Sequence, residues 1–191
     1  MKKERLKRML DERTLVLIKP DAVKRGLIGV ILERFERAGL KIVSCKLVLA
    51  TREQLDGHFP KSEDWVCGMG HHTLEASKEY DFNPVDIFGT DDPFKIGLRI
   101  KEWNYNYLLS GSIMVLVLQG VHVIDTVRKF VGYTLPNKAM PGTIRGDFSV
   151  NASDLANTLK IACENLVHAS STQAEAEQEI SNWFKPDEIL S

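Results

Sequence analysis

Two short apolar runs place the strongest constraint on the fold of this chain. They cover residues 14–18 (TLVLI) and 112–118 (SIMVLVL). Each run has the length of a buried β-strand and is far shorter than the roughly 20 residues needed to cross a membrane. Residues 41–50, KIVSCKLVLA, alternate between apolar and polar side chains, which indicates a third, half-buried strand. The chain is therefore expected to fold around a small β-sheet.

Helical patterns occupy much of the sequence between these runs. Residues 26–38 carry apolar side chains at helical spacing and stop at Gly39, while residues 123–130 have the pattern of a shorter helix. An Asp-Asp-Pro sequence predicts the start of a helix over residues 94–107. The order of strands and helices, with helices on one face, predicts an α+β sandwich of the ferredoxin-like split βαβ type, built on an antiparallel sheet.

Length, charge and cysteine content limit the classes of protein to be considered. The 191 residues fit a single domain, and the formal net charge of −1 gives no basic field for a nucleic-acid partner. Cys45, Cys67 and Cys163 share no metal-ligand spacing and cannot all pair, which favours free thiols in a reducing compartment. The charged N-terminal extension 1–12 starts like a signal peptide but has no apolar stretch. We expect a cytoplasmic protein with no membrane partner.

His168 is the strongest candidate for chemistry. It lies in the segment 165–179, NLVHASSTQAEAEQE, within a turn of small residues that precedes an acidic helix. An imidazole is partly unprotonated at neutral pH, so it can attack phosphorus if a carboxylate fixes the tautomer of its ring. Glu175 and Glu179 lie one helical turn apart, and either one could supply that carboxylate. Alternatively, His168 is a hydrogen-bonded turn residue and both glutamates are solvated.

Two further segments add positive charge. Residues 128–148 contain Arg128, Thr134 and Arg145 among glycines and prolines, and a guanidinium fork and a hydroxyl suit the oxygens of a polyphosphate. Lys19 follows the first apolar run directly, at a strand end where clefts commonly lie. The alternatives are a surface loop with scattered cations and a lysine that merely flanks a strand.

Together, these segments resemble nucleoside diphosphate kinase over about residues 13–190. The matching motifs are LIKPDAV at 17–23, GYTLP at 132–136, PGTIRGDF at 141–148, NLVHAS at 165–170 and EAEQEISNWF at 175–184. Several independent motifs in the family's order make a chance match a poor explanation. The resemblance also implies the ferredoxin-like fold described above.

The resemblance implies a role for each matched residue. His168 would be the phosphorylated nucleophile, with Glu179 orienting its other ring nitrogen and Ser170 supporting that contact. Arg128, Thr134 and Arg145 would bind the phosphates of the nucleotide. Lys19 and Asn165 would bind the sugar hydroxyls, and Lys19 would also lie near the transferred phosphate.

The resemblance further implies a ping-pong transfer of the terminal phosphate from a nucleoside triphosphate to a nucleoside diphosphate. The expected cofactor is Mg²⁺, held mainly by the nucleotide's own phosphates because no carboxylate cluster indicates a dedicated metal site. The family also implies a homo-oligomer, either a hexamer or a tetramer. Two alternatives share the scaffold: a protein kinase that uses phosphohistidine as its donor, and a non-catalytic regulator that binds nucleotide or nucleic acid.

The chain departs from the family pattern at three positions. Phe59 stands where a tyrosine is usual, and Ala169 replaces the glycine that usually follows the histidine. Ile100 falls where the family places an aromatic ring against the base, so we expect Ile100 to cover the base, unless it is simply a core residue. Other aromatic residues could cover the base instead: Trp65, Tyr80, Phe82, Phe88 and Phe94. No polar side chain is evidently placed to read the base edges, which predicts broad nucleotide use.

Two insertions lengthen the chain relative to the common core of the family, at about residues 61–98 and 150–161. The second contains a helix that is expected to start after Ser153. The first is too short to have a core of its own, which favours a lid or an oligomer contact. His71 and His72 invite a metal site with Cys67, but adjacent histidines point in different directions on regular structure.

Overall fold

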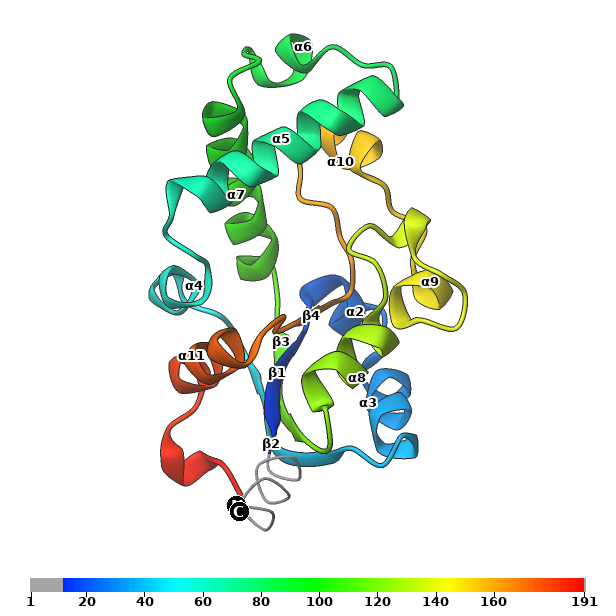
Figure 1. The fold of residues 1–191 in the computed structure, drawn as a ribbon, viewed down its shortest axis with the longest axis vertical. Coiled ribbons are helices and arrows are strands. Elements are labelled where there is room, and N and C mark those ends of the chain that lie inside the picture. The colour runs from blue at the N-terminus through cyan, green and yellow to red at the C-terminus, as the bar shows by residue number, and fades with distance from the viewer. Residues whose placement is uncertain (1–11, 191) are drawn as a thin grey trace.

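A four-stranded antiparallel sheet lies at the centre of the computed structural model, which describes residues 12–190 (Figure 1). Its strands are β1 (Arg13–Ile18), β2 (Lys41–Val48), β3 (Ile113–Gln119) and β4 (Val167–Ala169), in the order β2-β3-β1-β4. All three neighbouring pairs are antiparallel. The ferredoxin-like prediction is therefore confirmed, and the predicted strand boundaries differ by at most two residues.

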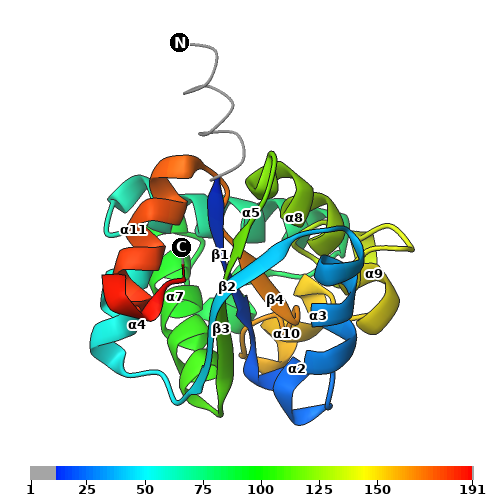
Figure 2. The ribbon, with the colours of Figure 1, turned by 90° about the horizontal axis from the view of Figure 1, so that it is seen from below.

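Helices cover both faces of the sheet, so the expectation of helices on one face is wrong. On one face, α3 (Ile28–Arg37) and α8 (Val123–Val131) pack on Val16 and Ile18 of β1. On the other, α4 (Arg52–His58), α7 (Pro93–Leu109) and α11 (Gln173–Trp183) pack on Leu15 and Leu17 (Figure 2). The physical reason is visible in the sequence, because a strand that is apolar at every position must be buried on both sides.

Residues 61–98, which were expected to form an insertion, contain α5 (Glu63–Glu79), α6 (Pro84–Phe88) and about the first third of α7. Two glycines let α5 and α7 touch through their backbones. A Cβ atom added at Gly70 would lie 1.9 Å from the carbonyl oxygen of Pro93, and one added at Gly97 would lie 1.9 Å from that of Val66. This crossing carries α5 away from the sheet and toward α10 (Ser153–Leu159), as Figure 1 shows.

The remaining elements are short and lie around the C-terminal end of β1. They are α2 (Pro20–Lys24), α9 (Ile144–Phe148) and the 3-10 turn η1 (Pro136–Lys138). A further turn, η2 (Pro186–Glu188), lies instead beside β2, where the hydroxyl of Ser44 donates to the carbonyl oxygen of Glu188 at 2.7 Å. The helix predicted after Ser153 is confirmed as α10, although the helix includes Ser153 and its N-cap is Ala152. Between residues 12 and 190, no helix is long and apolar enough to span a membrane. Most of the charged N-terminal extension lies outside the described residues.

Candidate active site

A strained turn places the candidate nucleophile. Leu166 is buried and has a φ of 69°, in the left-handed region that a residue with a branched side chain rarely occupies. The backbone N–H of Val167 donates across this turn to the carbonyl oxygen of Asn165 at 2.8 Å, and the N–H of Lys19 donates to the carbonyl oxygen of Leu166 at 2.8 Å. Strain of this kind persists where the surroundings fix the backbone, often at functional sites. Here it brings Asn165 and His168 beside Lys19.

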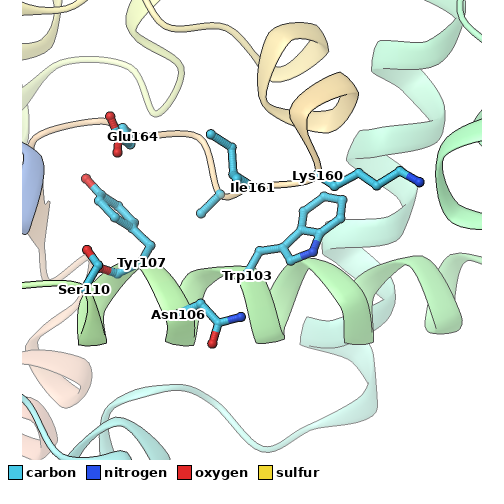
Figure 3. Close-up of a pocket in the computed structure, with 8 residues that line it drawn as sticks. Trp103, Asn106, Tyr107, Ser110, Lys160, Ile161 and Glu164 are labelled. Carbon is cyan, nitrogen blue, oxygen red and sulfur yellow. The ribbon is translucent and has the colours of Figure 1, made fainter.

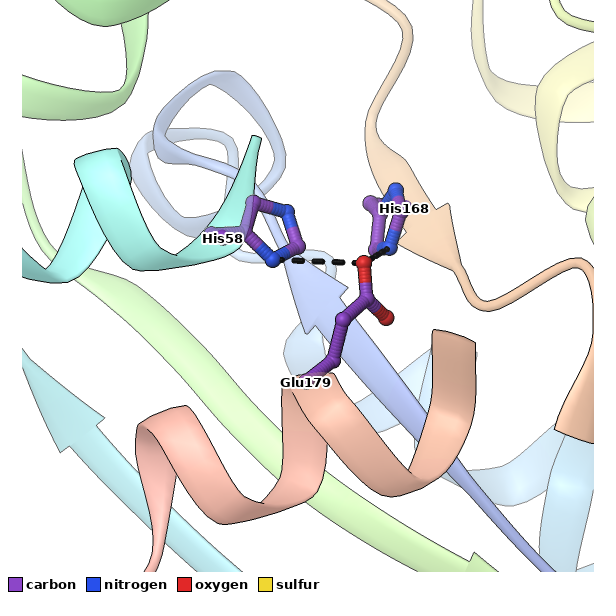
Figure 4. Close-up of side chains that lie close together, drawn as sticks. All are labelled: His58, His168 and Glu179. Atoms are coloured by element: carbon purple, nitrogen blue, oxygen red, sulfur yellow. Dashed lines mark ion pairs between the residues drawn. The ribbon is translucent and has the colours of Figure 1, made fainter. Parts of the chain in front are cut away.

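His168 on β4 contacts a buried carboxylate from α11. Its Nε2 lies 2.7 Å from Oε1 of Glu179, in a bent geometry that is short of a well-aligned hydrogen bond (Figure 4). The hydroxyl of Ser170 donates to the other carboxylate oxygen at 2.6 Å. Glu175 is occupied elsewhere, since it accepts from the backbone N–H of Ser171 at 2.6 Å. The choice between the two glutamates thus falls to Glu179, and Nδ1 of His168 is the ring nitrogen left for chemistry.

A second histidine, His58, completes this cluster and was not anticipated from the sequence. It ends α4, is only 4% exposed, and places Nδ1 3.3 Å from the same oxygen of Glu179. The indole N–H of Trp183 donates to that Nδ1 at 3.4 Å. The two imidazole rings meet edge to face with centroids 4.6 Å apart. No local pattern marked His58, because only the packing of α4 on α11 brings it to the site.

Burial controls the charge of these groups. It raises the pKa of Glu179 to about 7 and lowers the pKa of His58 to about 3. Burial, followed by the positive charge of Lys19, also holds the pKa of His168 well below its usual range. Both imidazoles are therefore uncharged at neutral pH, and the lone pair on Nδ1 of His168 is available for attack.

Lys19 and Asn165 form a fixed polar pair next to His168. The ammonium of Lys19 donates to Oδ1 of Asn165 at 2.7 Å, and the amide nitrogen of Asn165 donates to the carbonyl oxygen of Thr134 at 2.9 Å. Burial, with a smaller contribution from Arg145, lowers the pKa of Lys19 to about 8. The fold thus brings together residues to which the family resemblance gives roles in binding the sugar and the phosphates.

Arg145 links α9 to two other segments of the site, the turn after α8 and the segment that runs into β4. Its guanidinium donates to the carbonyl oxygens of Asn165 at 3.1 Å, Gly132 at 2.8 Å and Val167 at 2.6 Å. A guanidinium has five N–H groups, so two remain for a phosphate. Arg128 lies exposed on the last turn of α8, near enough for its charge to help lower the pKa of Arg145.

A cavity of about 410 Å³ opens beside this cluster. Thr134, Cys163 and Asn165 line its inner end, Ile100 and Trp103 of α7 form one wall, and α5 and α10 form the outer walls. The prediction that Ile100 faces the nucleotide fits this position. None of the five aromatic candidates lines the cavity, whereas Trp103, which no sequence pattern singled out, does.

Trp103 also lines a smaller cavity of about 250 Å³ (Figure 3). Tyr107, Asn106 and Glu164 line the smaller cavity, and Trp103, Ile161 and Ala162 line both. The smaller cavity contains none of the groups around His168. The larger one, which Thr134 and Asn165 line, is therefore the candidate nucleotide site.

Phe59, which stands where a tyrosine is usual, packs within a group of rings. Its centroid lies 5.7 Å from that of Trp65 and 5.2 Å from that of Tyr105. The hydroxyl in this region belongs to Tyr105 and donates to Asp56 at 2.8 Å. Phe59 therefore contributes packing next to His58 rather than a hydrogen bond.

The metal-ligating groups of the site can be compared with what Mg²⁺ requires. In the described part of the chain, one group of three side chains could chelate an ion: His58, His168 and Glu179. Mg²⁺ prefers oxygen ligands, whereas two of these three ligands are imidazole nitrogens. These three side chains are therefore poor ligands for Mg²⁺. The metal site considered at His71, His72 and Cys67 is not among the groups found in the described residues.

Comparisons with known proteins agree with this geometry. The sequence model of the family described as nucleoside diphosphate kinase matches residues 12–66 and 102–189. The chain is 48% identical to the nucleoside diphosphate kinase of Pyrobaculum aerophilum over 94% of its own length and 98% of that protein. It is 39% identical to the nucleoside diphosphate kinase of Pyrococcus horikoshii over 94% of its length and 88% of that protein.

Solved structures give the same result. An NDP kinase crystal structure from Pyrobaculum aerophilum superposes with a TM-score of 0.92 and 45% identity, covering 95% of this chain and all of that one. The Borrelia burgdorferi nucleoside-diphosphate kinase, in a transition-state mimic with bound vanadate and ADP, superposes with a TM-score of 0.77 and 33% identity. That match covers 96% of this chain and 92% of the other. The family model skips residues 67–101, which form most of α5, α6 and the first half of α7.

Proposed function

The chain belongs to the nucleoside diphosphate kinase family, and we propose that His168 carries the phosphoryl group when it transfers the terminal phosphate of a nucleoside triphosphate to a nucleoside diphosphate. The observation that carries this assignment is the contact between Nε2 of His168 and Glu179, at 2.7 Å. It turns the opposite nitrogen, Nδ1, toward the substrate. An experiment that isolates the phosphorylated chain and maps the modified residue tests it.

The transfer proceeds in two half-reactions. In the first, the lone pair of Nδ1 forms a bond to the terminal phosphorus while the bond to the bridging oxygen breaks, and the nucleoside diphosphate leaves. Positive charge grows on the ring, and the carboxylate form of Glu179, which predominates above its pKa of about 7, stabilises that charge through Nε2–H. In the second, an oxygen of the acceptor diphosphate attacks the same phosphorus and Nδ1 leaves with its electron pair.

Charge on the transferred group is balanced by side chains that surround His168. Lys19, Arg128 and the free N–H groups of Arg145 stabilise the equatorial oxygens, and the hydroxyl of Thr134 adds a neutral donor. Asn165 and Lys19 bind the sugar. We assign the divalent cation as Mg²⁺, which when bound to the nucleotide neutralises phosphate charge.

The side-chain contacts of His168 argue against a non-catalytic regulator on this scaffold. Such a protein would not need a buried carboxylate 2.7 Å from a nitrogen of a neutral histidine, nor the hydrogen bond from Ser170 that holds that carboxylate at 2.6 Å. A protein acceptor would use the same phosphorylated histidine, so it would add to the nucleotide reaction rather than replace it.

The base is placed between α7 and the segment that leads into β4. Trp103 and Ile100 cover one side of the cavity, and Ala162 lies on the other. Trp103→Ala should raise KM for all nucleotides about tenfold with little change in kcat, because stacking on an aromatic ring contributes about 1–3 kcal/mol per base. Steady-state kinetics with ADP and GDP measure this. Phe94→Ala is the matched control, since Phe94 lies on α7 outside both cavities, and an equal rise in both variants would refute the placement.

The fall of kcat/KM at alkaline pH should reflect the deprotonation of Lys19. Its pKa is lowered to about 8, so the ammonium is charged below pH 8 and loses its proton as the pH rises further. We expect kcat/KM to fall above an apparent pKa of about 8. Lys19→Arg should move that limb to higher pH, because a guanidinium stays charged. A pH profile that is identical in both proteins would contradict the role of Lys19.

The assembly and location follow the family expectation. We propose a homo-oligomer, a hexamer or a tetramer, in the cytoplasm. Large apolar side chains that are exposed in the single chain support an assembly, among them Val150 (89% exposed) and Met140 (72% exposed). Light scattering of the purified protein decides the number of subunits.

A further inference from the structure

The outer wall of the nucleotide cavity contains polar atoms that have no partner. Asn157 on α10 is 6% exposed, lines the cavity, and its amide nitrogen makes no hydrogen bond. One turn earlier, Ser153 also lines the cavity, and its hydroxyl is buried and unpartnered. A buried polar group without a partner is costly, so such groups in a native structure call for a ligand or a water.

Several other polar side chains around the cavity make hydrogen bonds or ion pairs within the protein. The hydroxyl of Thr73 donates to the carbonyl oxygen of Met69 at 3.0 Å, and the amide of Asn104 donates to that of Ile100 at 3.0 Å. Lys138 pairs with Glu79 at 2.6 Å and His72 with Glu75 at 3.3 Å. Asn157 and Ser153 of α10 thus differ from these side chains, because each has a buried polar atom without a partner.

The path of a bound nucleotide leads toward α10. Its phosphates lie at His168 and its sugar at Asn165, so the base extends from Asn165 into the cavity, between Trp103 and Ala162. The far side of that space is walled by α5 and α10. Asn157 and Ser153 therefore face the edge of the base rather than its ring plane or its sugar.

We propose that Asn157, with Ser153 beside it, hydrogen-bonds the edge of the nucleotide base and makes this chain discriminate between bases. This rests on the proposed function, because it uses the nucleotide orientation set by His168. A carboxamide offers both a donor and an acceptor, and it pairs best with a base edge that presents the complementary pair. A base that lacks this pair leaves the buried amide unsatisfied, which is how a polar pocket rejects an analogue.

The proposal replaces the expectation of broad nucleotide use. That expectation held because no polar side chain was evidently placed to read a base. Both residues lie in the second insertion, 150–161, and only folding brings α10 to the cavity that Thr134 and Asn165 line.

Asn157→Leu tests the proposal, because leucine keeps the number and branching of the side-chain heavy atoms and removes hydrogen bonding. The phosphorylated enzyme is mixed with ADP, GDP, CDP or UDP, and kcat/KM for discharge is measured for each. We expect wild type to favour its best base over its worst by at least about tenfold, and the variant to lose at least about tenfold on the best base alone. The control is Asn106→Leu, since Asn106 lines the smaller cavity behind Trp103, and it should keep the wild-type ratios.

Two results would overturn the proposal: equal discharge by all four diphosphates in wild type, or an equal change for all four in Asn157→Leu. If Asn157→Leu does not fold, the proposal is tested on wild-type protein alone. Purine riboside diphosphate, which lacks the exocyclic groups of the base, should then discharge at least about tenfold more slowly than the preferred purine, and an equal rate would refute base reading. A chain that forms no phosphoenzyme at all refutes the proposed function, whereas a phosphoenzyme discharged equally by every base refutes only this inference.

Discussion

His168→Ala is expected to lower kcat/KM for phosphate transfer by more than about a thousandfold while ADP still binds. The substitution removes the atom that forms the covalent intermediate, and loss of a nucleophile is among the largest effects known in enzymes. Binding should be retained because, in the proposed assignment, Lys19, Arg128 and Asn165 rather than the imidazole contact the phosphates and the sugar. Coupled assays give the activity and calorimetry gives the dissociation constant of ADP.

The control for this variant is His71→Ala. His71 is exposed on α5 and lines neither cavity, so its loss should leave activity within about twofold of wild type. Substantial transfer by His168→Ala would mean that another side chain carries the phosphate. Equal losses in the two variants would mean that the effect is not specific to the site.

Arg145→Lys is expected to lower both activity and stability. Lysine keeps the positive charge but has one nitrogen, so it cannot serve the carbonyl oxygens of Gly132, Asn165 and Val167 together. Leaving buried carbonyl groups unsatisfied should reduce the free energy of unfolding by about 2–4 kcal/mol. The loss of the planar phosphate donors should cut kcat/KM by about tenfold or more.

Denaturant titration and steady-state kinetics separate these two effects. The matched control is Arg52→Lys, because the pair between Arg52 and Glu102 is exposed and contributes little to stability. Activity should be measured at a temperature where both variants are folded. If Arg145→Lys unfolds like the control, the hydrogen bonds to the three carbonyl groups do not stabilise the loops. If it is also fully active, Arg145 does not bind phosphate.

The fold was predictable where the sequence has a local cause for it. The apolar runs at 14–18 and 112–118 became the two central strands, and the order of elements gave the ferredoxin-like topology. The expectation of helices on one face failed because β1 is apolar on both sides, with Val16 in one core and Leu17 in the other. That pattern was present in the sequence and should have predicted two cores.

The site was predictable to the extent that its residues lie within the sequence motifs of the family. The structure brings His168, Glu179, Ser170, Lys19 and Asn165 together, and the roles of these residues remain predictions. His58 and Trp103 could not be placed from the sequence, since the first depends on α4 packing on α11 and the second on the path of α7. That path follows from the close crossing at Gly70 and Gly97, which no local pattern announces.

The most direct test of the central claim is the isolation of the phosphoenzyme. Wild-type protein is incubated with Mg²⁺ and ATP labelled at the terminal phosphate, freed of nucleotide, and divided between acid, base and GDP. A phosphohistidine should be lost in acid, survive in base, map to His168 and pass its label to GDP. A label that survives acid, maps to another residue or stays on the protein when diphosphates are added would contradict the account.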